Sequence, residues 1–152
     1  MPWEKTFAML KPDTVQRGLI GEVTCRIERK GFRVAAMKLI QVSEEQARRQ
    51  YAVHQGKPFY EGLVRYIQGG PVVALVLEAP DAVAQLRLLV GATRPNEAEP
   101  GSIRGDLGID ISNNLIHASD SPENAELEMS IYFTEEELLS YSRAADHWLA
   151  EE

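Results

Sequence analysis

Four β-prone segments stand out in the pattern of hydrophobic and polar positions. The apolar run over residues 71–77 is continuous and of strand length, which predicts a central strand buried on both faces. Three further segments, at residues 6–10, 32–42 and 129–133, predict the remaining strands. The pattern therefore favours a sheet of four strands.

Helical spacing of apolar residues lies between and after these strands. The segment 20–31 ends on Gly31, in the usual C-cap position, and Ser43-Glu-Glu-Gln46 is a capping box that opens the next helix. The other predicted helices cover residues 59–68 and 81–90, a short segment capped by Ser121, and an amphipathic C-terminal segment opened by Thr134.

The predicted order reduces to β-α-β-β-α-β, the split βαβ arrangement. The expected fold class is α+β and ferredoxin-like: a four-stranded antiparallel sheet covered by helices on one face. No repeat or linker interrupts the pattern, so residues 1–152 are expected to form one domain. The irregular stretch 92–114 is long for a compact domain, and such stretches are usually functional.

Charge and cysteine content narrow the possible settings. The net charge of −7 argues against general nucleic-acid binding, which requires a basic face. No apolar run reaches transmembrane length and no signal-peptide core is present, so no membrane association is expected. The single cysteine, Cys25, excludes an intrachain disulfide and a multi-cysteine metal cage. A cytoplasmic protein is predicted.

The segment Asn114-Leu-Ile-His117-Ala-Ser-Asp-Ser121 carries the strongest candidate chemistry. Imidazole is largely neutral near pH 7, so one ring nitrogen has a free lone pair. That nitrogen can accept a phosphoryl group if neighbours fix the ring and phosphate-binding groups hold the electrophile. Read alone, His117 is more readily a structural or turn histidine.

Four motifs precede the histidine segment in a set order. They are Lys11-Pro-Asp13, Arg17-Gly-Leu-Ile-Gly21, Gly91-Ala-Thr93-Arg-Pro95 and Pro100-Gly-Ser-Ile-Arg104-Gly-Asp106. Together with the histidine segment they resemble the nucleoside diphosphate kinase family, from about Thr6 to Phe133. The resemblance implies the ferredoxin-like fold. It also implies ping-pong transfer of the terminal phosphoryl group of a nucleoside triphosphate to a nucleoside diphosphate, through the δ nitrogen of His117.

The resemblance assigns phosphate contacts to Lys11, Arg87 and Arg104. A magnesium–nucleoside triphosphate is an anion that two or three well-placed cations can neutralise. Guanidinium groups suit two-point contact with phosphate. We therefore predict that the two arginines bind the non-transferred phosphate and that Lys11 approaches the migrating one. Without the resemblance, Lys11 is more readily a solvated strand end and Arg87 a surface residue.

Five further side chains take roles from the resemblance. Thr93 would bind phosphate, although it also suits a turn cap, and Asn114 would bind ribose hydroxyls, although it also suits a left-handed turn. Glu128 would hold the imidazole, unless it is a solvated glutamate. Ser119 would donate to the phosphoryl group, and Tyr51 would line the site or belong to the core.

The nucleobase is expected to stack on Phe59, with Leu63 one helical turn further on. Stacking contributes about 1–3 kcal/mol per base and tolerates any base. No cluster of side-chain donors suited to a base edge is present here, so broad tolerance of base and sugar is predicted. Taken alone, Phe59 also suits a core aromatic. Mg²⁺ is expected to be held mainly by the nucleotide's own oxygens, without a protein metal site.

Two alternatives to an enzyme are a non-catalytic nucleotide-binding regulatory module on the same fold and a purely structural domain. A regulatory module predicts loss of the histidine or of the phosphate-binding cations, and this sequence retains them. The expected partners are nucleoside tri- and diphosphates. The resemblance also implies a homo-oligomer, either a hexamer or a tetramer.

Overall fold

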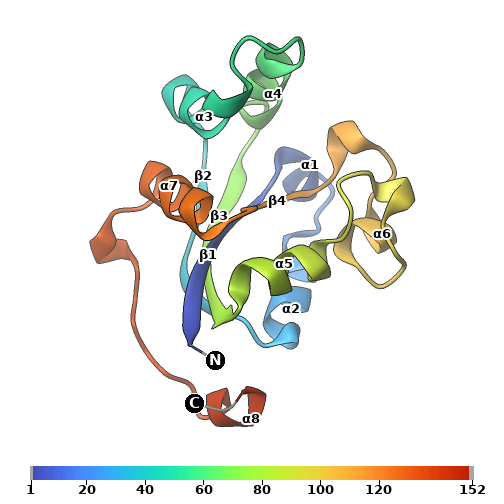
Figure 1. The fold of residues 1–152 in the computed structure, drawn as a ribbon. Coiled ribbons are helices and arrows are strands. Elements are labelled where there is room, and N and C mark those ends of the chain that lie inside the picture. Colours follow the sequence, from blue (N-terminus) through green and yellow to red (C-terminus); the bar gives the residue numbers. More distant parts are fainter. Residues whose placement is uncertain (1, 151–152) are drawn as a thin grey trace.

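One four-stranded antiparallel sheet organises the computed structural model, which describes residues 2–150. Its spatial order is β2-β3-β1-β4 (Figure 1). The strands are β1 (Trp3–Leu10), β2 (Arg33–Ile40), β3 (Val72–Pro80) and β4 (Ile116–Ala118). This is the split βαβ topology, so the predicted ferredoxin-like class is confirmed.

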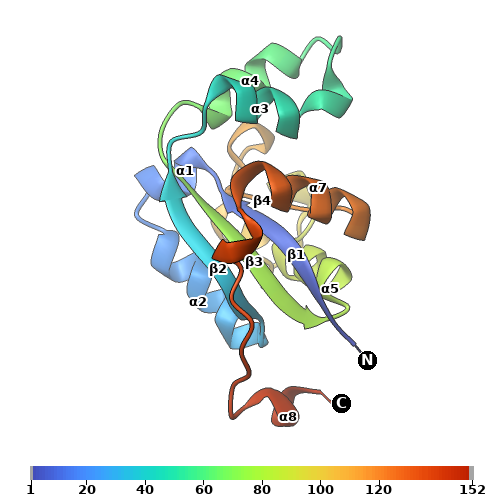
Figure 2. The same cartoon turned by 90° about the vertical axis from the view of Figure 1, so that its left-hand side faces the viewer.

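Helices cover both faces of the sheet, which is more than the one-face coverage predicted. Figures 1 and 2 show α7 on one side of the sheet and α2 and α5 on the other. Because successive strand residues point to opposite faces, the buried run of β1 feeds two cores: Phe7 and Met9 one, Ala8 and Leu10 the other. The bounds are α1 (Pro12–Gln16), α2 (Ile20–Lys30), α3 (Glu44–Gln50), α4 (Tyr60–Ile67), α5 (Ala82–Val90), α6 (Ile103–Leu107), α7 (Pro122–Tyr132) and α8 (Asp146–Leu149).

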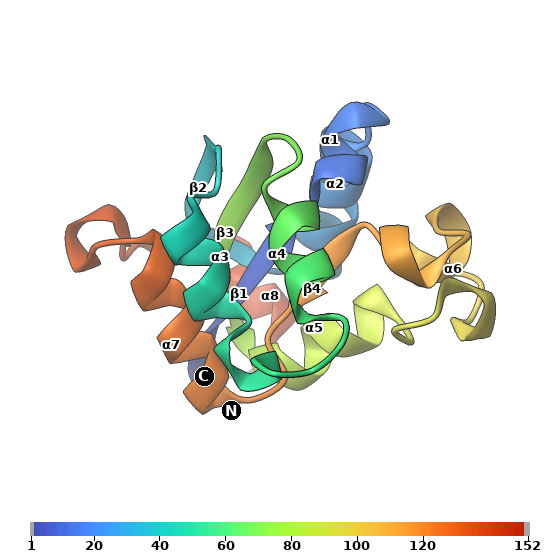
Figure 3. The same ribbon diagram turned by 90° about the horizontal axis from the view of Figure 1, so that it is seen from above.

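Several predicted helix ends form as the sequence indicates. The Ser43 hydroxyl accepts a hydrogen bond from the Gln46 amide, and the Gln46 side chain accepts one from the Ser43 amide, which completes the capping box. Gly31 ends α2 with φ +120°, a conformation that favours glycine. Ser121 caps α7 by accepting from the Asn124 amide. Seen from above, α3 lies between α4 and α7 (Figure 3).

The fourth strand was predicted in the wrong place. Residues 129–132 continue helix α7, and the strand is instead the three-residue β4. The apolar–polar alternation of the segment 129–133 is incidental, because its buried side chains follow helical spacing together with those upstream. These buried positions are Ala125, Glu128, Ile131 and Tyr132.

The C-terminal helix predicted from Thr134 is also wrong. A 3-10 turn follows this residue, and the described chain ends in the short helix α8. Between them, the Leu139 amide donates to the Ala35 carbonyl of β2 at 2.9 Å, and Arg143 donates to the carbonyls at the end of α2. The first contact is made with the edge strand β2, and the others with Gly31 and Phe32 in the turn between α2 and β2.

The helices are short. Among the described residues the longest, α2 and α7, have 11 residues each. A membrane-spanning helix needs about 20 apolar residues. Within residues 2–150, no helix is long and apolar enough to cross a bilayer.

Gly105 in α6 leaves no room for a side chain. A Cβ atom there would lie 2.0 Å from the Glu99 carbonyl oxygen. Because the obstacle is backbone, we expect Gly105→Ala to lower the free energy of unfolding by about 2–3 kcal/mol. Gly62 in α4 has nothing within 4 Å, so Gly62→Ala should raise it by about 0.5–1 kcal/mol. Urea unfolding measures both; undiminished stability of Gly105→Ala would contradict this close approach.

Candidate active site

His117 occupies the middle of β4, opposite Met9 of β1. Its neighbours Ile116 and Ala118 point into the core beneath α5, so the imidazole points to the opposite face, toward α7. The ring centroid lies 6.1 Å from that of Phe7, and 25% of the side chain is exposed. The strand therefore anchors the histidine while leaving part of the ring accessible.

Glu128 fixes the orientation of this ring. One carboxylate oxygen of Glu128 is hydrogen-bonded to Nε2 of His117, and the other accepts from the hydroxyl of Ser119 at 2.9 Å. With Nε2 facing a carboxylate, the ring proton resides there and Nδ1 keeps its lone pair. Within residues 2–150, Nδ1 has no hydrogen-bond partner.

Ser119 lies behind the imidazole and not beside the cavity. The side chain is fully buried, and its hydroxyl donates to Glu128, whereas the sequence predicts donation to a phosphoryl group. The hydroxyl satisfies the second oxygen of a carboxylate that is itself only 6% exposed. A buried carboxylate requires such partners, so Ser119 stabilises the group that holds the histidine.

A cavity of about 240 Å³ connects the imidazole to both predicted arginines. It lies between β4, α5, α6, α7 and the turn after α3. Its lining includes six predicted site residues: Tyr51, Arg87, Thr93, Arg104, His117 and Glu128. Side chains from segments distant in the sequence therefore meet where a polyanion can reach the histidine.

The two arginines reach this cavity in different ways. Arg87 projects from α5 and donates to the Ala118 carbonyl at 3.0 Å, beside the histidine. Arg104 comes from α6, is 7% exposed, and donates to the carbonyls of Gly91, Asn114 and Ile116. Burial, followed by the charge of Arg87, lowers the pKa of Arg104 to about 10, so the Arg104 guanidinium is still cationic at neutral pH.

Lys11 and Asn114 lie immediately behind the cavity. The Lys11 ammonium donates to the Asn114 side-chain oxygen at 2.7 Å, and the Asn114 amide donates to the Thr93 carbonyl at 3.0 Å. Burial, together with the positive charge of Arg104, lowers the pKa of Lys11 to about 8, although Asp13 opposes this shift. The asparagine thus links two of the predicted phosphate-binding residues.

Phe59 and Leu63 do not line the cavity itself. Phe59 is 51% exposed at the start of α4, and its ring meets that of His54 edge-on, with centroids 5.2 Å apart. His54 does line the cavity, so Phe59 stands at its rim. Leu63 packs against the core one turn further along α4. An exposed aromatic face at the rim is available for stacking.

The sequence interpretation missed several cavity residues. Asp120 lines the cavity, although the sequence predicts no role for this residue in the site. The Asn124 side chain and then the charges of Arg87 and His117 lower its pKa. Asn124 and Leu127 line the same cavity from the face of α7 that carries Glu128. Their spacing of three and four residues was the available signal, but it is visible only once this segment is recognised as one helix.

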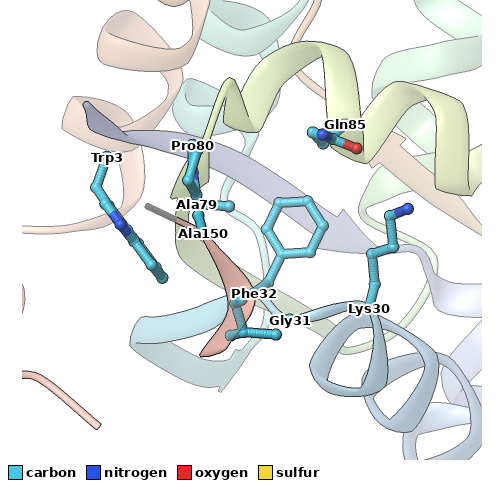
Figure 4. Close-up of a pocket in the computed structure, with 9 residues that line it drawn as sticks. Trp3, Lys30, Gly31, Phe32, Ala79, Pro80, Gln85 and Ala150 are labelled. Carbon is cyan, nitrogen blue, oxygen red and sulfur yellow. The ribbon is translucent and has the colours of Figure 1, made fainter. Parts of the chain in front are cut away.

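A second cavity, of about 280 Å³, lies at the other end of β1. Figure 4 shows Trp3 and Phe32 on its walls, with Lys30 and Gln85 nearby. Lys30 is the only charged side chain among its described lining residues, and no imidazole is present there. The groups needed for phosphoryl transfer, an imidazole and two arginines, line the cavity at His117 and not this one.

The fold and this site together indicate a phosphotransferase that acts on a polyanionic substrate. Comparison with known proteins narrows the class. A family model described as nucleoside diphosphate kinase matches residues 4–138. The nucleoside diphosphate kinase of Thermus thermophilus is 56% identical over 136 residues, which cover 90% of this chain and 99% of that protein. That of Archaeoglobus fulgidus is 52% identical over 149 residues, covering 98% and 99%.

Structural comparison agrees. A halophilic nucleoside diphosphate kinase from Halobacterium salinarum in complex with CDP has a TM-score of 0.94 and 47% identity, with 97% of this chain and 99% of that chain covered. The chain therefore belongs to the nucleoside diphosphate kinase family. It is a phosphotransferase that moves a terminal phosphoryl group from a nucleoside triphosphate to a nucleoside diphosphate. A non-catalytic module is not favoured, because the relatives are named as kinases.

The buried ammonium of Lys11 predicts a conflict between stability and activity. Its pKa of about 8, below the ordinary 10.5, means that the folded protein bears the full destabilising effect of the buried charge below pH 8. That effect is relieved as the pH rises from about 8 to 10.5. We expect Lys11→Met to raise the free energy of unfolding at pH 7 by about 1–3 kcal/mol while abolishing most activity.

Urea unfolding at pH 7 and pH 10 tests this expectation. The gain in the free energy of unfolding of Lys11→Met over the wild type should be smaller at pH 10, where the wild-type lysine is largely neutral. The matched control is Lys30→Met, which removes an exposed lysine and should not raise the free energy of unfolding at pH 7 by a comparable amount. If Lys11→Met is no more stable than the wild type at pH 7, or if the gain in the free energy of unfolding is equal at both pH values, the destabilising effect of a buried Lys11 charge is contradicted.

Proposed function

We propose that the transfer follows a ping-pong course through Nδ1 of His117. The lone pair of Nδ1 forms a bond to the γ-phosphorus as the bond from that phosphorus to the bridging oxygen breaks, and the nucleoside diphosphate leaves with that electron pair. A terminal oxygen of a second diphosphate then attacks the phosphohistidine and regenerates the imidazole. The observation that carries this proposal is the hydrogen bond between Nε2 and Glu128, which leaves Nδ1 at the cavity.

Glu128 and Tyr51 support this chemistry in complementary ways. The carboxylate stabilises the positive charge that the imidazole gains as the N–P bond forms. Tyr51 lines the same cavity, and burial, followed by the charge of Glu128, raises the pKa of its hydroxyl. The hydroxyl therefore stays protonated and is a donor for a phosphoryl oxygen.

The phosphates are bound by four residues in this proposal. Arg87 and Arg104 bind the non-transferred phosphate, and the exposed Thr93 hydroxyl joins them from the turn after α5. Lys11 approaches the migrating phosphoryl group from behind the cavity. Because phosphoryl transfer depends on positioning and on cancellation of negative charge, these cations stabilise the transition state directly.

The nucleoside would lie at the rim of the cavity. Phe59 offers an exposed ring for stacking, with Leu63 beneath it, and Asn114 would contact the ribose hydroxyls. The halobacterial relative is described in complex with CDP, which supports a pyrimidine nucleotide here as well. Stacking does not read a base edge, so we propose broad tolerance of base and of ribose or deoxyribose.

The donor set near the histidine suits a magnesium ion carried by the nucleotide. Of the described residues that line the cavity, the carboxylates are Asp120 and Glu128, and Glu128 is occupied by His117 and Ser119. Among residues 2–150, no three metal-ligating side chains are grouped to hold a metal ion. Mg²⁺ would neutralise phosphate charge and be held mainly by phosphate oxygens.

We further propose a cytoplasmic homo-oligomer, a hexamer or a tetramer, in which residues 1–152 form one domain. Strand β2 is an edge of the sheet and exposes Met37 and Leu39, which supports self-association because exposed apolar edges favour pairing. The nucleotide substrates support the cytoplasmic setting. Light scattering measures the assembly directly.

Labelling with γ-labelled ATP and magnesium tests the nucleophile. The wild-type protein should gain acid-labile, alkali-stable phosphate that ADP or GDP removes. His117→Ala should abolish this label and reduce turnover to near the uncatalysed level, because no group remains to form the N–P bond. His147→Ala, which changes an exposed histidine of α8, should be labelled like the wild type. Label retained by His117→Ala would reject the assignment.

Substitution of Phe59 tests the stacking site. Phe59→Ala removes the exposed ring, so KM should rise about tenfold for each nucleotide, in line with the energy of one stacked base. Steady-state kinetics with ATP, GTP, CTP and UTP should show similar increases. A new and strong preference for one base would contradict stacking as the source of affinity.

A further inference from the structure

We propose that Asp13 and Tyr66 form a positioning pair, which holds Lys11 and the backbone turn at Leu115 in the geometry that phosphoryl transfer requires. This inference rests on the roles proposed above for Lys11 and His117. Neither Asp13 nor Tyr66 is among the described residues that line the cavity. They act through other residues and do not touch the reacting atoms.

The turn at Leu115 is strained. Leu115 has φ +75°, a conformation that a side chain bearing Cβ rarely adopts, and its side chain is completely buried. Such a residue raises the energy of the fold and persists only where its surroundings hold it. Its position is critical, because it separates Asn114 from the strand that carries His117.

Lys11 and the first turn of α1 hold both polar backbone groups of this turn. The Leu115 amide donates to Oδ2 of Asp13 at 3.1 Å. The Leu115 carbonyl accepts from the Lys11 amide at 2.8 Å and from the Thr14 hydroxyl at 2.6 Å. The segment that carries the candidate lysine is therefore bonded directly to the turn that leads into the candidate nucleophile.

Tyr66 connects this arrangement to α4. Its hydroxyl donates to Oδ1 of Asp13, and its ring lies beside the Lys11 ammonium, with Nζ 5.7 Å from the ring centroid. Burial, followed by the hydrogen bond to Asp13, raises the pKa of Tyr66, so the hydroxyl remains a donor. Each carboxylate oxygen of Asp13 thus has its own partner, one in α4 and one in the turn.

The pair also sets the charge around Lys11. Three charged or titratable groups face its ammonium: Asp13 from α1, Tyr66 from α4 and Arg104 from α6. Arg104 lowers the pKa of Lys11, whereas the Asp13 carboxylate raises it. Asp13 therefore helps to keep Lys11 cationic near pH 8 while fixing where it lies.

Asp13→Asn separates these effects from a general loss of structure. The amide is nearly isosteric and can still accept from the Leu115 amide, but it lacks the charge. We expect kcat to fall on the order of tenfold with KM little changed, since hydrogen bonds to a charged group are the stronger ones. The alkaline limb of the pH profile of kcat/KM should move to lower pH, because Lys11 loses its proton more readily.

Tyr66→Phe keeps the ring and the Asp13 charge but removes the hydroxyl. It should lower kcat severalfold while leaving the alkaline limb in its wild-type position. The matched control is Tyr141→Phe, which removes a hydroxyl that donates to the Val34 carbonyl on the edge strand β2, far from the site. That variant should keep the wild-type kcat and pH profile.

The outcomes distinguish this inference from the proposed function. If the wild-type protein gains no phosphate on His117, the proposed mechanism fails. If it is labelled normally but Asp13→Asn keeps the wild-type alkaline limb, the electrostatic role is overturned. If both Asp13→Asn and Tyr66→Phe retain the wild-type kcat, the positioning role is overturned. The inference is supported if kcat is lowered in both variants and the alkaline limb of the kcat/KM profile moves only in Asp13→Asn.

Discussion

The hydrogen bond between Nε2 of His117 and the buried carboxylate of Glu128 is the contact on which the site depends. A carboxylate that is 6% exposed is destabilising unless its oxygens are bonded, and His117 and Ser119 satisfy both of them. The same contact decides which ring nitrogen carries the proton. The requirement to satisfy a buried acid and the requirement to expose a nucleophilic nitrogen are therefore met by one arrangement of β4 and α7.

Positive charge around this contact is concentrated in an otherwise acidic protein. The hydrogen-bond acceptors of Arg104 are carbonyls, that of Arg87 is a carbonyl, and that of Lys11 is a side-chain amide. Burial is the main cause of the lowered pKa values of Lys11 and Arg104, and repulsion from a neighbouring arginine, Arg104 and Arg87 respectively, is the second. A polyanionic ligand relieves this repulsion, so binding should stabilise the fold as well as the transition state.

Local signals were sufficient to predict much of the fold. The Ser43 capping box, the Gly31 helix end and the buried central strand each depend on residues close in sequence, and they form as predicted. Strand β4 was missed because it is three residues long with a polar residue at its centre, which leaves almost no periodicity to detect. It is defined by its pairing with β1, a long-range interaction.

The error at the end of α7 also explains which site residues were missed. The motifs indicated the chemistry of His117 and Glu128 without any knowledge of the helix. Asn124 and Leu127 reach the cavity only because they share a helical face with Glu128. A segment read partly as a strand at residues 129–133 hides that face. The sequence motifs thus identified the residues whose chemistry is distinctive. The residues that only shape the cavity could be identified only from the three-dimensional structure.

Placement on a paired strand explains how the imidazole is kept in position. Ile116 and Ala118 are buried in the core beneath α5, while His117 between them faces the opposite side of the sheet. Any displacement of the ring along the strand would move two core side chains and break the pairing with β1, which a dense interior resists. The strained residue Leu115 lies immediately before this strand, where its amide is bonded to Asp13 and its carbonyl to Lys11 and Thr14. Precision at the nucleophile therefore derives from the core and from the bonds of the preceding turn, and does not depend on the cavity itself.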